Sequence, residues 1–238
     1  MGSFKDFLVN NFSFLGRYKR WGVVVKDTLT PVKKSYSQYG EDEFIASKLE
    51  NYNLRDAMYV DIGANHPTDI SNTYLLYRKG QRGVVIEPNQ ELIGLFKKFR
   101  KRDIALGIGC SNKSTILKFN ISKTPVLSSF SNDRGIILDK QVYLPVMTLD
   151  QALENIEFQV ISLLSIDVEG LNREVLEGAT TSLKKTLIVC IEFDTSEEKK
   201  GFETILNNDF ELIHTVKCNL IYLNKELSAK LKKKETFK

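Results

Sequence analysis

The chain has 238 residues, 42% hydrophobic and 27% charged, which is enough apolar material for the core of one medium-sized domain. Its net charge of +4 and the lack of an arginine and aromatic stripe argue against a nucleic-acid-binding protein, and no apolar run reaches the roughly 18–20 residues that a membrane-spanning helix needs. Three widely spaced cysteines fit neither a disulfide framework nor a zinc site, and no signal-peptide pattern is visible, so we expect a cytoplasmic protein without stable membrane insertion.

The N-terminal segment, residues 1–35, is rich in phenylalanine and other bulky apolar residues, but their spacing is only partly helical. We expect a helical extension that packs on the main domain or helps a homo-oligomer to form. Association with a membrane surface is the weaker alternative, because it is supported only by four basic residues of this segment. These are Lys5, Arg17, Lys19 and Arg20.

The rest of the chain alternates short apolar runs with helix-like stretches. The run from Met58 to Ile62 favours a strand because it is short and rich in strand-forming residues, and Gly63 permits the turn that follows it. Similar patterns predict strands at 83–87, 103–109, 160–167, 186–192, 210–216 and 220–223, and helices at 41–49, 71–79, 90–100, 148–155, 172–184 and 201–207. The segment 118–144 looks less regular, and its part from Leu127 to Gly135 suits either a mobile cover over a pocket or an ordinary surface loop.

Buried strands that alternate with helices indicate a Rossmann-like α/β fold, with a mostly parallel sheet and helices on both faces. The closing hairpin, residues 210–223, makes the sheet mixed. Without an internal repeat or a linker, we expect one domain over residues 36–225, preceded by the helical extension 1–35 and followed by a basic C-terminal tail at 226–238. The charge run of the tail predicts a solvated or frayed helix.

Polar residues end the predicted parallel strands, where ligands bind in open sheets of this kind. They are Asp61, Glu87, Ser111, Asp167 and Glu192. Glu87 follows Asp61 at about the spacing of the ribose-binding acid in dinucleotide folds, but the turn between them has the single glycine Gly63 instead of a glycine-rich phosphate loop. The acidic turn would repel a pyrophosphate and suits a cofactor with a cationic amino-acid end, such as S-adenosylmethionine.

Several motifs in order along residues 36–195 resemble the signature of FkbM-type methyltransferases, a family of class I, S-adenosylmethionine-dependent enzymes. The motifs are Ser37-Gln-Tyr-Gly-Glu-Asp-Glu43, Val60-Asp-Ile-Gly-Ala-Asn-His-Pro67, Gly83-Val-Val-Ile-Glu-Pro-Asn89, Ile166-Asp-Val-Glu-Gly170 and Glu174-Val-Leu-Glu-Gly178. The resemblance implies a seven-stranded sheet whose last strand is antiparallel. It also implies O-methylation of a sugar or a sugar-containing small molecule, for a surface glycan, a capsule or a natural product.

The resemblance also assigns roles to individual residues. Asp61, Gly63 and Asn65 would hold the methionine end of the cofactor, Glu87 its ribose, and Asn89 and Ser111 its adenine, while Gln38 and Tyr39 would cover the cofactor and Asp167 would lie beside the transferred methyl group. Taken alone, the turn that contains Gln38 and Tyr39 is more typical of a helix start than of a ligand contact.

A hydroxyl acceptor gains from a general base, and four residues are candidates. They are His66, Asp167, Glu169 and Glu192. For His66, the alternative to a role as the base is a structural role in its turn. For the three carboxylates, the alternative role is to bind Mg²⁺. A hard divalent cation prefers carboxylate ligands and would lower the pKa of the acceptor hydroxyl.

The acceptor is expected to be a sugar, a nucleotide sugar or another phosphorylated metabolite. A phosphoramidate-type group for a surface glycan is the second choice. Two other classes remain open: a nicotinamide-dependent oxidoreductase, which would need the missing glycines, and a non-catalytic cofactor-binding module.

Overall fold

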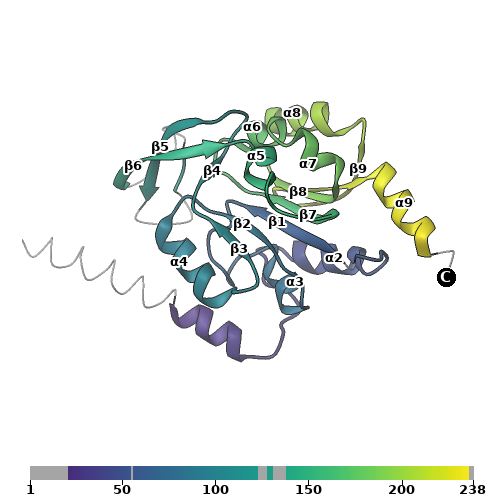
Figure 1. Ribbon diagram of the computed structural model, residues 1–238, viewed down its shortest axis with the longest axis horizontal. Coiled ribbons are helices and arrows are strands. Elements are labelled where there is room, and N and C mark those ends of the chain that lie inside the picture. The colour runs from purple at the N-terminus through teal and green to yellow at the C-terminus, as the bar shows by residue number, and fades with distance from the viewer. Residues whose placement is uncertain (1–20, 55, 123–127, 131–137, 236–238) are drawn as a thin grey trace, which may run out of the picture.

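The computed structural model describes residues 21–54, 56–122, 128–130 and 138–235, which form a seven-stranded sheet with helices on both faces and a smaller second sheet (Figure 1). The strands are β1 (Ala57–Ile62), β2 (Gly83–Ile86), β3 (Ile104–Leu106), β4 (Gly109–Cys110), β5 (Thr115–Ser122), β6 (Leu138–Met147), β7 (Val160–Ile166), β8 (Thr186–Glu192), β9 (Phe210–Val216) and β10 (Asn219–Asn224). The helices are α2 (Glu41–Leu49), α3 (Tyr74–Arg78), α4 (Gln90–Phe99), α5 (Leu149–Leu153), α6 (Asn172–Glu177), α7 (Thr180–Lys184), α8 (Ser196–Leu206) and α9 (Lys225–Glu235).

The main sheet has the strand order β3-β2-β1-β7-β8-β10-β9. Strands β3, β2, β1, β7 and β8 are parallel, whereas β10 runs antiparallel to both β8 and β9. The predicted Rossmann-like fold with an antiparallel last strand is therefore confirmed. The central strands β1 and β7 are buried along almost their whole length, which explains why they read as continuous apolar runs instead of alternating patterns.

Each face of the main sheet packs against its own group of helices. Val175 of α6 and Phe202 of α8 belong to a core that includes Val60 and Ile62 of β1. On the other face, Ile45 of α2 and residues of α3 pack with Tyr59, the neighbour of Val60 in the same strand. Successive residues of β1 thus point to opposite faces of the sheet. The carboxyl end of β1 lies between the two helix layers.

The segment predicted to be irregular, residues 118–144, instead contributes two long strands to the second sheet, whose order is β4-β6-β5. Strand β5 is antiparallel to β6, and the two pair from Thr115 opposite Val146 to Ser122 opposite Leu138. The burial of β5 does not alternate strictly, since Ile116 is exposed but the neighbours Phe119 and Asn120 are both buried. The prediction failed because β5 lacks the period of two that marks a half-buried strand.

Two other predicted elements are divided in the structure. The expected strand 103–109 is split between β3, in the main sheet, and β4, in the second sheet. The expected helix 172–184 is broken into α6 and α7 at Gly178, where a Cβ would lie 2.3 Å from the carbonyl oxygen of Ser111. Gly178 is therefore required for the close approach of this chain segment to the end of β4.

A buried arginine ties the start of the sheet to the loop after β1. Arg100 is fully buried, and its Nε donates to Asp103 at 2.7 Å. Its Nη2 donates to the hydroxyls of Tyr59 at 2.9 Å and Thr73 at 3.0 Å. The Thr73 hydroxyl in turn donates to Asp61 Oδ2 at 2.5 Å. Asp61 thus belongs to a buried network in which the guanidinium offsets the charge of the carboxylates.

The described part of the N-terminal extension includes a helix over residues 21–29, which lies beside α3 and α4 in Figure 1. Val24 of this helix is buried, and Arg78 donates from Nη2 to the carbonyl oxygen of Thr30 at 2.9 Å. Residues 1–20, where most of the predicted extension falls, lie outside the described residues. At the other end α9 forms the greater part of the predicted tail and buries Leu231. Within the described ranges no helix is both long and apolar enough to cross a bilayer.

Candidate active site

The candidate site lies where β1, β2 and β7 end, and Gly63 allows two of these ends to meet. Gly63 has a φ angle of +77°, and a Cβ at this position would lie 1.8 Å from the carbonyl oxygen of Asp167. The amide of Asp167 donates to the carbonyl of Ile62 at 2.9 Å, and the amide of Gly63 donates to that of Ile86 at 2.9 Å. Only glycine satisfies both the backbone angle and the close contact.

Glu87 follows β2 and points its carboxylate toward the turn after β1. Its Oε2 accepts from the amide of Asn65 at 2.9 Å, and its Oε1 accepts from the amide of Asn89 at 2.8 Å. The side chain is only 6% exposed, and burial raises the pKa of Glu87 to about 7 although both amide hydrogen bonds oppose the shift. This carboxylate is therefore fixed in place and close to its titration point at neutral pH.

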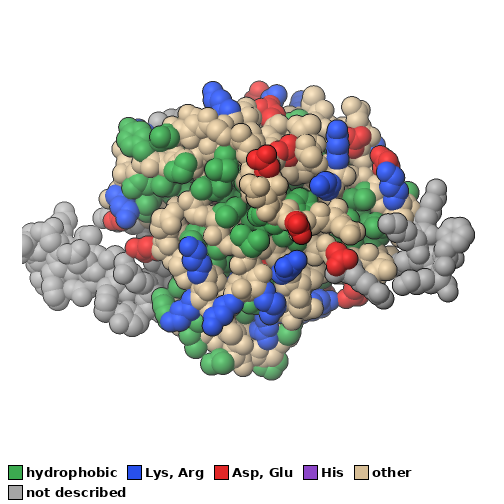
Figure 2. All heavy atoms as spheres, viewed as in Figure 1, with side chains coloured by type: hydrophobic (Ala, Val, Ile, Leu, Met, Phe, Trp, Pro, Cys, Tyr) green, Lys and Arg blue, Asp and Glu red, His purple; other side chains and the backbone are tan. Residues whose placement is uncertain are grey.

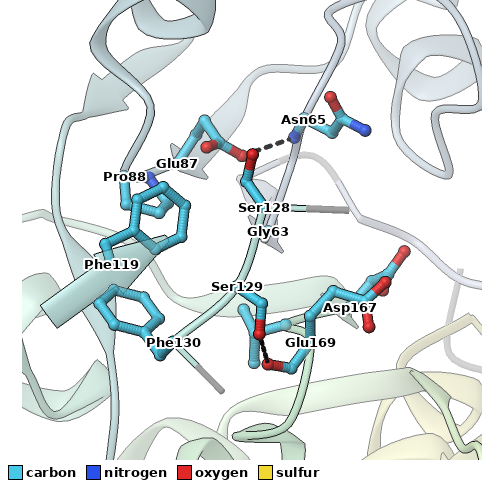
Figure 3. Close-up of a pocket in the computed structure, with 11 residues that line it drawn as sticks. Gly63, Asn65, Glu87, Pro88, Phe119, Ser128, Ser129, Phe130, Asp167 and Glu169 are labelled. Atoms are coloured by element: carbon cyan, nitrogen blue, oxygen red, sulfur yellow. Dashed lines mark hydrogen bonds between the residues drawn. The ribbon is translucent and has the colours of Figure 1, made fainter. Parts of the chain in front are cut away.

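The second sheet supplies the opposite wall of the site. Phe119 of β5 and Phe130 lie with their ring centroids 4.7 Å apart, in a tilted arrangement. Ser129 holds this wall in place, because its backbone pairs with that of Asn120 and its hydroxyl donates to the carbonyl of Glu169 at 2.9 Å. Figure 3 shows the two phenylalanines on one side of the pocket and the acidic side chains that follow β7 on another.

The pocket between these walls has an empty volume of about 480 Å³, including space open to solvent. It is lined by Gly63, Asn65, Glu87, Pro88, Phe119, Ser128, Ser129, Phe130, Asp167, Val168 and Glu169. The pocket thus combines an aromatic wall with carboxylates on separate strands.

Three carboxylates converge beyond β7 and β8. Asp167, Glu169 and Glu192 each place a carboxylate oxygen within 4.8 Å of the others. Asn172 helps to hold this arrangement, because its Oδ1 accepts from the amide of Val168 at 2.8 Å and its Nδ2 donates to the carbonyl of Glu192 at 3.0 Å. The sequence prediction that these three acids form one group agrees with this geometry.

Burial raises the pKa of Asp167 well above its ordinary value. A hydrogen bond to Glu192 and the negative charges of Glu192 and Glu169 act in the same direction. The side chain of Asp167 remains open to water in the pocket although protein surrounds its carboxyl group. Water access weakens the contribution of burial, so we attribute the direction of the shift mainly to the adjacent carboxylates.

The structure brings five of the predicted site residues into the pocket wall and one more beside it. Gly63, Asn65, Glu87, Asp167 and Glu169 line the pocket, and Glu192 joins its acidic end.

Other predicted site residues lie behind the wall. Asp61 is turned toward Thr73, and burial raises its pKa although the Thr73 hydroxyl donates to it. Asn89 caps α4 by accepting from the amide of Glu91. The amide of Ser111 donates to the carbonyl of Met147.

Gln38 and Tyr39 also lie outside the residues that line the pocket. Gln38 Nε2 donates to the Tyr39 hydroxyl at 2.9 Å, and the Tyr39 ring is 41% exposed. Glu41 orders this turn by accepting from the amide of Tyr39 at 2.9 Å and from the Asn219 side chain at 2.7 Å. Their predicted role as a cover over the cofactor stays a prediction.

His66 is buried in the turn that follows Asn65. Its Nδ1 accepts from the amide of Asp69 at 3.0 Å and from that of Thr68 at 3.4 Å. The lone pair of Nδ1 is directed at these backbone amides, so this nitrogen is not available to take a proton from an acceptor. Of the two roles predicted for His66, this geometry favours the structural one.

The sequence reasoning missed the aromatic wall as a binding element. Pro88, Phe119 and Phe130 carried no motif, although the segment from Leu127 to Gly135 was considered as a cover. Ser128, Ser129 and Phe130 of that segment do line the pocket, and the rest of it lies outside the described residues.

Comparisons with known proteins give a family and a set of similar structures. The family model described as the methyltransferase FkbM domain matches residues 61–222. No curated protein sequence matches the chain. Eleven chains among the solved structures match it.

One similar structure is WbdD in a co-crystal with the kinase inhibitor LY294002, at 13% identity and a TM-score of 0.44, and the match covers 76% of this chain and 40% of WbdD. Another is a putative RNA methyltransferase, PH1948 from Pyrococcus horikoshii, at 11% identity and a TM-score of 0.42. This match covers 87% of this chain and 96% of that protein. A third is precorrin-6y C5,15-methyltransferase from Geobacter metallireducens GS-15, at 10% identity and a TM-score of 0.39. This match covers 82% of this chain and 93% of that protein. The chain therefore spans less than half the length of WbdD.

Proposed function

Because the chain belongs to the FkbM methyltransferase family, we propose that it transfers a methyl group from S-adenosylmethionine to a hydroxyl oxygen of a small acceptor. The observation that carries the proposal is the pairing of Glu87, fixed by two backbone amides, with a separate acidic group at Asp167 in one pocket. A carboxylate at Glu87 can accept hydrogen bonds from ribose hydroxyls, and a carboxylate at Asp167 favours a cationic group nearby. The expected cytoplasmic location is part of the same proposal.

The residues present suit such a cofactor. Glu87 has lone pairs left on both carboxylate oxygens after the two amide contacts, and these can accept hydrogen bonds from the two ribose hydroxyls. The Phe119 and Phe130 rings and Pro88 offer an apolar wall for a base. Gly63 allows the chain segments that follow β1 and β7 to approach each other closely beside the pocket. The bound cofactor would supply a methyl group made electrophilic by a sulfonium charge.

The acidic end of the pocket is where we place the acceptor. Most of the acceleration of a displacement comes from holding the two reacting atoms in line, and carboxylates can fix an acceptor through its hydroxyl groups. Glu192 and Glu169 can also take up the proton that the attacking hydroxyl loses, and a general base of this kind contributes about 10²–10⁴-fold. Asp167 lies beside both of these acids, with carboxylate oxygens of the three residues within 4.8 Å of one another.

Binding of Mg²⁺ by the same three acids is a second arrangement that their spacing allows. The ion would offset the negative charge of the three acids, and it would lower the pKa of the acceptor hydroxyl. Turnover after exhaustive treatment with EDTA separates the two arrangements, since only the metal-dependent one stops.

We propose a sugar or nucleotide sugar as the acceptor class, with a phosphorylated or phosphoramidate-type group of a surface glycan as the second choice. Both rest on what the family resemblance implies. Isothermal titration calorimetry with S-adenosylmethionine and then with NAD tests the cofactor: binding of the first alone supports the proposal, and binding of NAD alone overturns it in favour of an oxidoreductase. A panel of acceptors assayed for release of S-adenosylhomocysteine then identifies the substrate, and acceptor-dependent release excludes a non-catalytic module.

A further inference from the structure

The N-terminal helix presents an apolar stripe to solvent, formed by Trp21, Val25, Leu29 and Val32. The exposed fractions of these side chains are 36%, 39%, 80% and 50%. The first three are spaced at i, i+4 and i+8, so they lie on one face of the helix over residues 21–29. An ordered helix with its apolar side outward is unusual, because a surface helix normally buries that side.

The packing of the helix against the domain fixes the outward direction of the apolar stripe. Val24 and Asp27, on the opposite side, are 0% and 2% exposed. Arg78 donates to the carbonyl oxygens of Asp27 and Thr30. The ring of Trp21 packs edge-on against Phe99 at the end of α4, with 5.4 Å between the centroids. These contacts hold the helix against the domain with the stripe facing away from it.

Basic side chains surround the apolar stripe. Lys98 places its Nζ 4.0 Å from the centroid of the Trp21 ring, and the exposed basic residues nearby in α4 and in the turn after it are Lys97, Lys101 and Arg102. Lys26 is exposed on the helix itself. Figure 2 shows lysine and arginine side chains gathered over the part of this face where Figure 1 places α3 and α4, with hydrophobic side chains at the lower tip beside them.

Within the helix over residues 21–29, Asp27 is the one acidic residue. Asp27 is buried and forms an ion pair with Lys33 at 2.6 Å. The negative charge of Asp69 also contributes to raising the pKa of Lys33. The surface around the stripe is therefore positive, with an indole ring at one end that combines an apolar body with a polar N–H group. These are the features of an interfacial helix, in which apolar side chains enter the acyl boundary and lysines meet anionic headgroups.

We propose that the apolar stripe and its basic rim dock this protein on an anionic lipid surface. A second copy of the chain fits less well, because a two-fold contact through the stripe would bring the basic side chains beside the stripe of one copy toward those of the other. The surface is independent of the cofactor pocket, whose lining contains none of its residues. The proposal therefore does not depend on the proposed reaction.

The test is co-sedimentation of the full chain with vesicles of phosphatidylcholine alone and with vesicles that also contain phosphatidylglycerol. Wild type is expected to bind the anionic vesicles, and to bind them less tightly as salt is added. The double variant Val25→Ser/Leu29→Ser is expected to lose at least about tenfold in affinity, since two exposed apolar side chains no longer enter the lipid. Lys98→Gln is expected to weaken binding several-fold and to reduce its dependence on salt.

The matched control is Ile116→Ser/Tyr143→Ser, which removes two apolar side chains that are 67% and 74% exposed on the second sheet. This control should bind anionic vesicles as wild type does, and circular dichroism verifies the fold of each variant. Equal binding by the stripe variant and wild type, or equal binding to neutral and anionic vesicles, would overturn the proposal. So would a wild-type dimer that the stripe variant dissociates while neither protein binds vesicles, because the stripe would then be a contact between copies.

Discussion

The substitution Glu87→Gln should weaken the binding of S-adenosylmethionine while it preserves the shape of the side chain. Both carboxylate oxygens of Glu87 accept backbone amides, from Asn65 at 2.9 Å and from Asn89 at 2.8 Å. A glutamine has one oxygen, so its NH₂ group must face one of these N–H donors. The variant therefore loses a charged acceptor for the ribose and strains the turn that positions it.

The expected loss is about 1.5–3 kcal/mol, the typical contribution of a hydrogen bond to a charged group, or about 10–150-fold in Kd. The pKa of Glu87 is raised to about 7 by burial, so the carboxylate that binds the ribose is present mainly above pH 7. Wild-type affinity should accordingly fall about tenfold between pH 8 and pH 6 as this group takes up a proton. The variant should lack this part of the pH dependence.

Calorimetric titration with S-adenosylmethionine from pH 6 to pH 8 measures both effects. An unchanged Kd for Glu87→Gln, or the same pH dependence in both proteins, would refute the assignment of Glu87 to the ribose. The second result would point instead to the carboxyl pair at Asp167, whose pKa is also raised. Asp167→Asn distinguishes these two groups, because it removes the pair and leaves Glu87 intact.

The same pKa has a consequence for stability without ligand. The folded-state value of about 7 lies above the ordinary value of 4.5, so between these pH values the folded protein binds more protons than the unfolded chain. Its free energy of unfolding should therefore fall as the pH rises from about 4.5 to 7, by on the order of 3 kcal/mol from this group. Urea unfolding of wild type and Glu87→Gln at pH 5 and pH 7.5 measures the difference, and a Glu87 contribution of the opposite sign would contradict it.

Four further variants test other parts of the site. Gly63→Ala should lower the free energy of unfolding by about 2–5 kcal/mol in thermal melts, because it combines backbone strain with a clash, whereas Gly94→Ala, whose Cβ meets nothing within 4 Å, should be neutral or stabilising. Phe119→Leu keeps most of the wall but removes an aromatic ring, so the Kd of the cofactor should rise about 2–10-fold in the same titration. Asp167→Asn should lower turnover by about 10²–10⁴-fold with a smaller effect on Kd, and loss of wild-type turnover in EDTA with recovery in Mg²⁺ would identify the cluster as a metal site. His66→Ala removes an acceptor from two amides and should cost about 1–3 kcal/mol of stability with turnover largely retained, while a large fall in turnover of a folded variant would restore His66 as the base.

The elements of the main sheet were predictable because their physical causes are local. Strand β1 is short, apolar and ended by Gly63, and the hairpin β9–β10 has a tight polar turn. Thr148 and Gln151 form the capping box that their spacing predicts. Such signals depend only on neighbours in the sequence.

The parts that the sequence did not reveal depend on contacts between distant segments. Gly178 breaks a helix only because Ser111 lies against it, and Phe119 becomes a pocket wall only because β5 pairs with β6 over the ends of the main strands. The strand-end rule placed Asp61 in the pocket, but Arg100 and Thr73 draw its carboxylate into the core. Position at a strand end indicates the rim of the site, and the neighbouring side chains decide which way a residue points.

The buried network around Arg100 also constrains how this protein can evolve. Tyr59, Asp103 and Thr73 are each joined to the guanidinium, although they come from different segments of the chain. Loss of any one partner leaves a charge or a polar group uncompensated in the core, at a cost of about 3–5 kcal/mol for a buried ion pair, whereas joint replacement by apolar residues avoids that cost. These positions should therefore covary among homologues, and mutations at them should show strong epistasis in double-mutant cycles. Arg100 and its partners would then change together during evolution. The second sheet, which forms the opposite wall of the pocket, would be free to diverge.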